Sequence, residues 1–215
     1  MNRATAVAQI QRLLGMRSDL ETEIIQALQD AQVDLESESE LPWFLVSEVS
    51  STTTTPDESR VPLPTDFIRE APEEEGGGLF LYDSTADEDE QWTPLEKVSL
   101  NVIRQAYQST DGEPEVYALD DEYFRLAPIP DDTYTLKMVF YQKDDILDTN
   151  IENKWLAKAS ELIIGIAGRK VAEAIRDAGA LQTFANMEVR GRKRLLDFAV
   201  ARQEESRVRQ MGGKD

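Results

Sequence analysis

The stretch TYTLKMVFY, from Thr133 to Tyr141, alternates between two kinds of side chain. Leu136, Met138 and Phe140 fall on one side of an extended chain, because successive side chains of a strand point to opposite faces. The residues between them, which include Lys137, fall on the other side. This period of two predicts a β-strand with one face in a core.

The residues before this strand predict its hairpin partner. YFRLAPIPDDTYTL reads as a strand that ends near Leu126, a proline-containing connection and the strand described above. Most prolines of the chain lie between Pro56 and Pro130, where they mark edges and corners because proline cannot donate to a central ladder. The segment Lys97–Tyr107 fits a strand and a short helix equally well.

The stretch VPLPTDFIRE, from Val61 to Glu70, is expected to be an ordered edge segment. Its two prolines fix an extended backbone, and Phe67 and Ile68 are apolar enough to be buried. The threonine tract Thr52–Thr55 before it and the acidic, glycine-rich segment Glu73–Gly78 after it are expected to be disordered.

Two helices are expected before the β segment. The first stops at Gly15. Ser18 and Glu21 have the spacing of a capping box at the start of the second helix. Apolar residues recur at helical spacing along both helices: Val7, Ile10, Leu14, Leu20, Ile24, Leu28, Ala31 and Leu35.

The chain is expected to be helical again after the β segment. Thr149 and Glu152 fit another capping box, Gly179 marks a break, and a last helix begins near Leu181. Beyond Ala201 the apolar stripe is lost and the sequence turns polar and basic. This tail is expected to be exposed or disordered unless a partner orders it.

The order of helices, strands and helices predicts an α+β fold. The first and last helices would otherwise lack partners for their apolar faces. We therefore expect residues 1–40 and 150–215 to form one helical bundle domain with a basic C-terminal tail. Residues 41–149 are expected to form an antiparallel, β-sandwich-like domain inserted into that bundle.

The formal net charge of −19 is unevenly distributed. Residues 40–150 carry 26 acidic and 7 basic side chains, whereas residues 151–215 carry 9 acidic and 13 basic ones. A strongly acidic surface repels nucleic acid and anionic membranes. Solubility is the simplest explanation, and a surface that DNA must pass without binding is another.

The chain has no cysteine and no histidine. This composition excludes disulfides, thiolate nucleophiles, Ser-His and Cys-His catalytic arrangements, and zinc sites with the usual ligands. The N-terminus lacks the apolar centre of a signal peptide, and the best apolar run, Leu162–Gly168, is too short to span a bilayer. We expect a soluble protein with no cofactor, no metal and no membrane partner.

Clustered carboxylates raise a different class of function. The clusters are Glu73–Glu75, Asp87–Glu90, Asp120–Glu122, Asp131–Asp132 and Asp144–Asp145. They suit a cation site or a carboxylate-based hydrolase, but none has the ligand spacing of an EF-hand loop. Solvated loops are the simpler interpretation, and no catalytic residue is expected among them.

The C-terminal segment reverses the charge of the rest of the chain. Its basic residues are Arg190, Arg192, Lys193, Arg194, Arg202, Arg207, Arg209 and Lys214. The pattern fits docking onto DNA or onto an acidic protein, and it equally fits a solvated helix face followed by a polar tail. The reversal of sign together with the loss of the apolar stripe favours a partner.

Several segments stand in a distinctive order. They are Trp43-Phe44 followed by the Ser/Thr tract, LPTDFIR (Leu63–Arg69), GEPEVYAL (Gly112–Leu119), FRLAPIPDDTYTLKMVFYQ (Phe124–Gln142) and NKWLAKASELIIGIA (Asn153–Ala167). The succession G-x-P-x-x-Y, L-x-P-x-P and Y-T-L-x-M-x-F-Y is the most specific part. The chain thereby resembles the adaptor, or head-tail connector, proteins of tailed bacteriophages, most closely the tail tubular and portal-adaptor proteins of short-tailed phages.

The resemblance implies a structural virion protein rather than an enzyme. Such a protein forms a homo-oligomeric ring, typically twelvefold, that docks on the portal protein and extends the DNA channel. DNA passes through the ring without specific binding, and the ring offers a platform to a nozzle or other tail component. The basic C-terminal residues would dock on the portal, in the host cytoplasm during assembly and in the neck of the finished virion.

Two alternatives stay open from the sequence. One is another neck connector or completion protein, from a long-tailed phage. The other is a carboxylate-based hydrolase or a cation-binding virion protein, which requires carboxylates that converge in a pocket.

Overall fold

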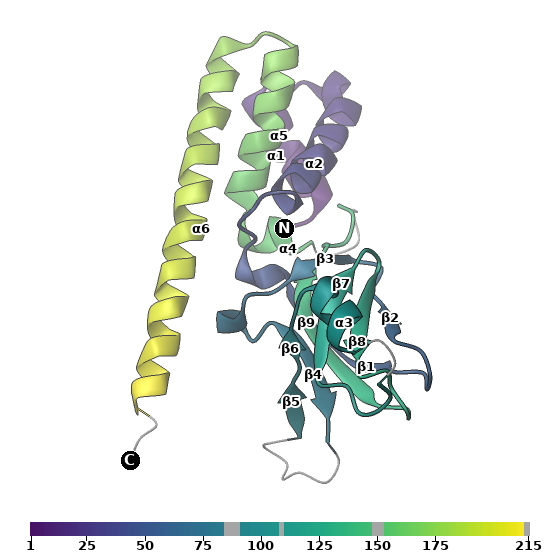
Figure 1. The fold of residues 1–215 in the computed structure, drawn as a ribbon. Coiled ribbons are helices and arrows are strands. Elements are labelled where there is room, and N and C mark those ends of the chain that lie inside the picture. The colour runs from purple at the N-terminus through teal and green to yellow at the C-terminus, as the bar shows by residue number, and fades with distance from the viewer. Residues whose placement is uncertain (84–90, 108–109, 148–152, 213–215) are drawn as a thin grey trace. The chain divides into compact units, whose positions relative to one another are not determined.

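The computed structural model of the chain describes residues 1–83, 91–107, 110–147 and 153–212 (Figure 1). Helices and mostly antiparallel strands make up an α+β fold, which confirms the predicted fold class. The chain divides into two compact units. Met1–Leu45 and Asp144–Asp215 form the helical unit, and Val46–Lys143 forms the β unit.

Two sheets make up the β unit. The five-stranded sheet has the order β1 (Val46–Thr53), β9 (Thr135–Gln142), β4 (Gly78–Tyr82) and β5 (Trp92–Pro94), and β3 (Phe67–Glu70) also pairs with β9. The four-stranded sheet has the order β2 (Arg60–Pro62), β8 (Tyr123–Ala127), β7 (Val116–Asp120) and β6 (Glu96–Lys97). β6 and β7 are parallel, and the other described pairs are antiparallel.

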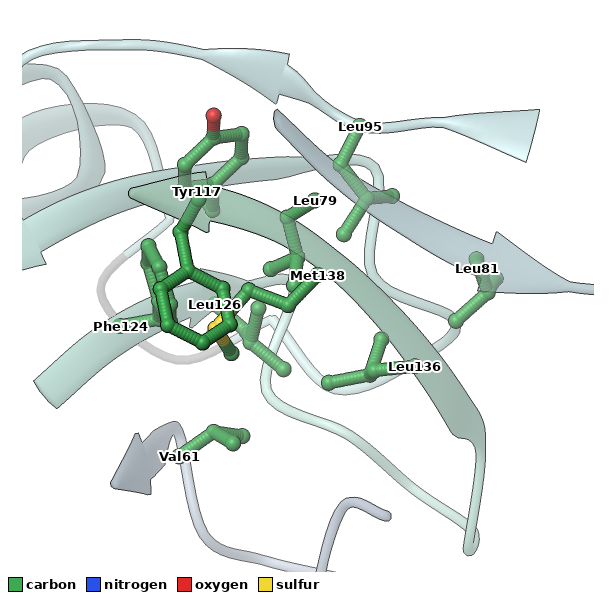
Figure 2. Packing of buried hydrophobic residues seen from close by; sticks show 10 residues of the cluster. Val61, Leu79, Leu81, Leu95, Tyr117, Phe124, Leu126, Leu136 and Met138 are labelled. Atoms are coloured by element: carbon green, nitrogen blue, oxygen red, sulfur yellow. The ribbon is translucent and has the colours of Figure 1, made fainter. Parts of the chain in front are cut away.

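The strand predicted from TYTLKMVFY is confirmed as β9, which pairs with β1, β3 and β4. Leu136, Met138 and Phe140 are buried, and they pack against side chains of the other sheet (Figure 2). The shared core holds ten buried residues: Val61, Leu79, Leu81, Leu95, Tyr117, Phe124, Leu126, Leu136, Met138 and Phe140. Residues of both sheets therefore close one apolar interior between them.

The predicted hairpin between β8 and β9 is wrong, because the two strands belong to different sheets. Their connection crosses from one sheet to the other, and its backbone pairs with the segment that follows β1. The Asp57 N–H donates to Pro130 O at 2.8 Å, and the Thr54 hydroxyl donates to Asp132 O at 2.9 Å. Placing the strands in facing sheets buries the inward side chains of both against each other, which edge-to-edge pairing would not do.

The order expected for VPLPTDFIRE is confirmed, because β2 and β3 occupy it. Phe67 packs against Phe124 and Phe140, with ring centroids 6.0 and 5.6 Å away. The disorder predicted for its neighbours is wrong. The threonine tract extends β1 and buries Thr54, and Glu73–Glu75 forms the 3-10 turn η3 immediately before β4.

A partly buried hydrogen bond links the two sheets. The hydroxyl of Tyr117 on β7 donates to Glu70 Oε1 on β3 at 2.6 Å, and Lys97 forms an ion pair with the same carboxylate. Burial, followed by the bond to Glu70, raises the pKa of Tyr117. The phenol therefore stays protonated and keeps its donor role. After β6 the ambiguous Lys97–Tyr107 segment becomes the helix α3 (Leu100–Ala106).

The helical unit contains α1 (Arg3–Leu13), α2 (Glu21–Glu36), α4 (Lys154–Lys158), α5 (Ser160–Ala174) and α6 (Ala178–Gly212). The apolar stripes predicted for the first two helices are confirmed, since all eight of their residues are buried. The capping box at Ser18 and Glu21 is wrong: a 3-10 turn, η1 (Ser18–Leu20), leads into α2, and no side chain caps that helix.

The C-terminal helices differ from the prediction at their ends. Thr149 and Glu152 lie outside the described residues, and the side chain of Asn153 caps α4 by accepting from Leu156 N at 3.1 Å. The break before the last helix comes ahead of Gly179, because α5 ends at Ala174 and α6 begins at Ala178. The backbone of α6 continues as a helix past Ala201 to Gly212, a segment expected to be exposed or disordered without a partner.

The hairpin of α5 and α6 is packed unusually closely. A methyl carbon placed on Gly165 would lie 2.6 Å from Glu188 N, and one placed on Gly191 would lie 2.6 Å from Leu162 Cα. A methyl group on Gly168 would overlap the ring of the buried Phe184. Two of these three glycines bring helix backbones into direct contact, so neither helix can move aside without separating from the other.

Alanine at either backbone contact should destabilise the helical unit. We expect Gly165→Ala and Gly191→Ala each to lower the free energy of unfolding by about 1–3 kcal/mol, because the added methyl group meets backbone atoms. Gly179→Ala is the matched control in the same hairpin, since its nearest neighbour is 3.5 Å away. The control should be neutral or stabilising by up to about 1 kcal/mol in urea unfolding. Equal effects at the three positions would contradict the close packing.

A polar network holds the chain where it returns to the helical unit. Glu36 Oε1 on α2 accepts from Gln32 Nε2, Asp144 N and Trp155 Nε1 at 2.9, 3.2 and 3.1 Å. Asp144 Oδ2 in turn accepts from Lys154 N and Trp155 N at the start of α4. Partial burial raises the pKa of Asp144 despite these hydrogen bonds. The network therefore contains a carboxylate that is harder to ionise in the folded protein than in the unfolded chain.

This carboxylate should make stability depend on pH. Because the pKa of Asp144 is raised on folding, its contribution is fully present below the ordinary aspartate pKa of about 4 and is lost as the pH rises through the folded value. Asp144→Asn mimics the neutral form at every pH. We expect the variant to gain stability relative to the natural chain as the pH rises from 4 toward 7 in urea unfolding. If the difference in free energy of unfolding between the two proteins stays constant with pH, or changes in the opposite direction, the raised pKa of Asp144 is contradicted.

Candidate functional site: the C-terminal helix

The helix α6 extends well past the helix on which it packs (Figure 1). Its buried stripe, Ala180, Phe184, Met187 and Gly191, faces α5, and Gly191 already lies against Leu162 near the start of α5. From Gly191 to Gly212 a helix rises about 30 Å, at 1.5 Å per residue. Phe198 continues the stripe but is 61% exposed. The second half of α6 is therefore a helix without α5 beside it.

Two arginines of the predicted docking set share one acid within the chain. Arg190 Nε donates to Glu161 Oε1 at 2.8 Å, and an Arg194 nitrogen lies 2.5 Å from Glu161 Oε2. The Arg194 contact is an ion pair without hydrogen-bond geometry. Glu161 stands in the first turn of α5, so both arginines bind α6 to α5.

A third arginine joins α6 to the segment after α2. The two terminal nitrogens of Arg192 donate to the two oxygens of Glu38 at 3.0 and 2.8 Å. Arg192 Nε also donates to Glu188 Oε1, one turn earlier on α6, at 3.5 Å. The hydrogen bonds with Glu38 are the main cause of the raised pKa of Arg192. A bidentate pair of this kind fixes direction as well as charge.

Arg202 lies on an aromatic cluster of the helical unit. Its guanidinium carbon is 4.6 Å from the centre of the Trp43 ring. Phe44 packs edge-on against both Trp43 and Trp155, with centroids 5.8 and 5.1 Å away. A cation over the face of a tryptophan ring is an attractive contact. It holds α6 to the helical unit at Arg202, C-terminal to the ion pairs described above.

The predicted docking residues thus do not form one free cluster. Arg190, Arg192, Arg194 and Arg202 contact other parts of the helical unit. Lys193 is exposed and makes no ion pair with the residues that the structure describes. Arg207 and Arg209 lie on the helical backbone of α6, and Lys214 lies outside the described residues.

The partners of these arginines were not predicted from the sequence. The pair Glu188–Arg192 has the spacing of i and i+4, which a search for helical ion pairs would find. Glu161, Glu38 and Trp43 are far from α6 in sequence. Only the packing of the helices brings them together, and no local signal points to it.

The acidic clusters have varied surroundings. Asp120 forms ion pairs with Arg60 and Arg125, and Asp144 belongs to the network at α4. Asp87–Glu90 lies outside the described residues. Across the described ranges, no three acidic side chains come together as a metal site would require. A hollow of about 150 Å³ between α1 and α2 is lined by one acid, Glu21, and by Arg3 among other residues.

None of the helices in the described part of the chain has both the length and the apolar character needed to cross a bilayer.

Glu161 offers a direct test of the ion pairs on α6. We expect Glu161→Gln to lower the free energy of unfolding by up to about 1 kcal/mol at low salt, a small value because both arginines are more than half exposed. The difference should shrink in about 1 M salt, where the Debye length is about 3 Å. Glu173→Gln, at an exposed site on the same helix, should stay within about 0.5 kcal/mol. A salt-independent loss at Glu161 would point to packing instead of charge.

Comparison with known proteins places the chain in a family. No curated protein gives a significant sequence match. The model of the SU10 adaptor protein family matches residues 1–212, which covers both the helical unit and the β unit. The resemblance to phage head-tail adaptors is thereby confirmed at the level of the family. The chain belongs to the SU10 adaptor protein family, a family of structural phage adaptors.

Proposed function

We propose that this protein is a head-tail adaptor that forms a ring on the portal of a phage. The ring, twelvefold in this proposal, extends the DNA channel and carries the next component of the tail, such as a nozzle. The observation that carries the proposal is the family match, because it spans residues 1–212 and so includes both units. Association with portal and tail components follows from an adaptor role. The protein would then lie in the neck of the virion.

The far end of α6 is the docking element in this proposal. Four arginines between Arg190 and Arg202 already contact the helical unit, so their charge is partly used within the chain. The remaining basic residues of the segment are Lys193, Arg207, Arg209 and Lys214. The last three follow Arg202, where α6 has passed beyond α5. They suit an acidic surface on the portal.

The charge of the β unit supports passage of DNA without binding. Val46–Lys143 holds 22 acidic and 7 basic side chains. Binding to DNA depends on basic side chains that replace counterions at the phosphates, and an acidic surface works against it. A channel bordered by such a surface repels the DNA that slides through it.

Truncation tests the docking role of the tail. A chain that ends at Arg202 keeps the Arg202–Trp43 contact and loses the basic residues after it. We expect this truncated protein to unfold at the same urea concentration as the full chain and to lose binding to the purified portal of its phage. Pull-down or light scattering with the portal measures the binding.

A charge variant separates basic contacts from helix length. Arg207→Gln, Arg209→Gln and Lys214→Gln together keep the full chain and remove three charges. We expect portal affinity to fall about tenfold or more, since three surface pairs of up to about 1 kcal/mol each are removed. Unchanged affinity of the truncated chain would refute the docking role. Loss with truncation and not with the charge variant would assign docking to apolar contacts.

A further inference from the structure

The helical unit carries opposite charge on its two outer helices. α5 lies between α2 and α6 (Figure 1). Two adjacent residues of α5 point toward different helices. Lys170 pairs with Asp34 of α2, and Arg169 pairs with Glu188 of α6. The outward faces of α2 and α6 are therefore on opposite sides of the unit.

The outward face of α2 carries acidic and no basic side chains. The helix has no basic residue, and Glu23 and Asp30 are exposed on it. Asp34 pairs instead with Lys170 of α5, and Glu36 belongs to the network at α4. The buried stripe of α2 faces the bundle, and Val33 lies on the opposite side of the helix with 62% of its surface exposed. Asp30, three residues before Val33, is exposed and bonds only to Gln26 among the described residues.

The outward face of α6 is apolar and carries Lys193. Val189, Leu196 and Val200 are 67%, 61% and 48% exposed. Their spacing of seven and four residues places them on one stripe, and Lys193 falls on the same stripe. This stripe lies opposite the one formed by Phe184, Met187 and Gly191, which is buried against α5.

We propose that the outward face of α2 in one copy of this chain docks on the Val189–Val200 stripe of α6 in a second copy. The exposed Asp30 and Val33 of α2 match Lys193 and Leu196 of α6 in charge and in apolar character. This match commits the stripe to a second copy, because every copy carries both faces on opposite sides of the same unit. Asp30 of one copy meets Lys193 of the next, and Val33 meets Leu196. The proposal rests on the proposed ring. It identifies the contact between neighbouring copies, which we call the seam, as α2 of one copy against α6 of the next.

A contact between two different faces has a geometric consequence. It is heterologous, so each copy uses one face toward each neighbour and the contact repeats around a closed ring. A contact of α6 with α6 would instead stop at a dimer. The seam offers few apolar side chains, and on α2 it presents one valine between polar residues. The contact is therefore weak for a single pair and depends on salt.

Covalent capture suits a weak contact, and the natural chain has no cysteine. We expect the full chain with both Val33→Cys and Leu196→Cys to form dimers, trimers and longer ladders with a short bismaleimide. Either single variant alone should remain monomeric. The control pair joins Leu196→Cys with Val102→Cys, an exposed valine of the β unit. Ladders from the control pair, or dimers from Leu196→Cys alone, would overturn the seam.

Charge reversal adds a second readout that misfolding cannot imitate. Lys193→Glu in the double-cysteine chain should lower the ladder yield by about two- to fivefold at low salt, the range of an exposed ion pair. Asp30→Lys in the same chain should restore it, because the pair is rebuilt with its signs exchanged. Failure of this rescue would contradict the pairing of α2 with α6.

Separate experiments test the seam and the portal-docking role, so either proposal can be refuted without the other. The capture experiment uses the purified chain without a portal, and portal binding is measured with the chain that ends at Arg202. Ladders together with unchanged portal affinity of the truncated chain would leave the seam and refute only the docking element. Portal binding without ladders would refute only the seam.

Discussion

At Gly165 and Gly191 the backbones of α5 and α6 approach until neither position has room for a methyl group. This approach gives the two helices a single register, since any slide brings a larger side chain into the contact. The register places Arg190 and Arg194, one turn apart, on Glu161, and it places Arg169 on Glu188. The ion pairs follow from the packing, because exposed pairs contribute at most about 1 kcal/mol each.

In the β unit, the residues that carry the charge are different from the residues that stabilise the fold. The ten residues shared between its sheets are apolar apart from the Tyr117 hydroxyl, which donates to Glu70. Acidic residues such as Asp121 and Asp131 lie exposed in turns. Surface acids can therefore change in number with little effect on the fold. In the proposed ring, this independence would let the charge beside the DNA change without altering the packing of the sheets.

The periodicity of the sequence predicts individual helices and strands, and it predicts little about how they pack together. The strand β9, the stripes of α1 and α2 and the α+β class follow from spacing alone, because one face of each element is buried. The β8–β9 hairpin was wrong because a proline-containing connection does not reveal which sheet the chain enters next. The partners of the C-terminal arginines were missed for a related reason: Glu161 and Trp43 reach α6 only through the packing of helices distant in sequence.

The insertion of the β unit has a consequence for the order of folding. α2 buries its stripe in a unit whose other half begins at Asp144, so all of Val46–Lys143 is synthesised between the two. At about 5–20 residues per second, roughly 7–28 seconds pass between the synthesis of the end of α2 and that of the end of α5. All ten residues of the shared β core lie within Val46–Lys143, so we expect the β unit to fold before the bundle closes. The apolar stripe of α2 therefore lacks its partner α5 until the chain from Asp144 onward has been made.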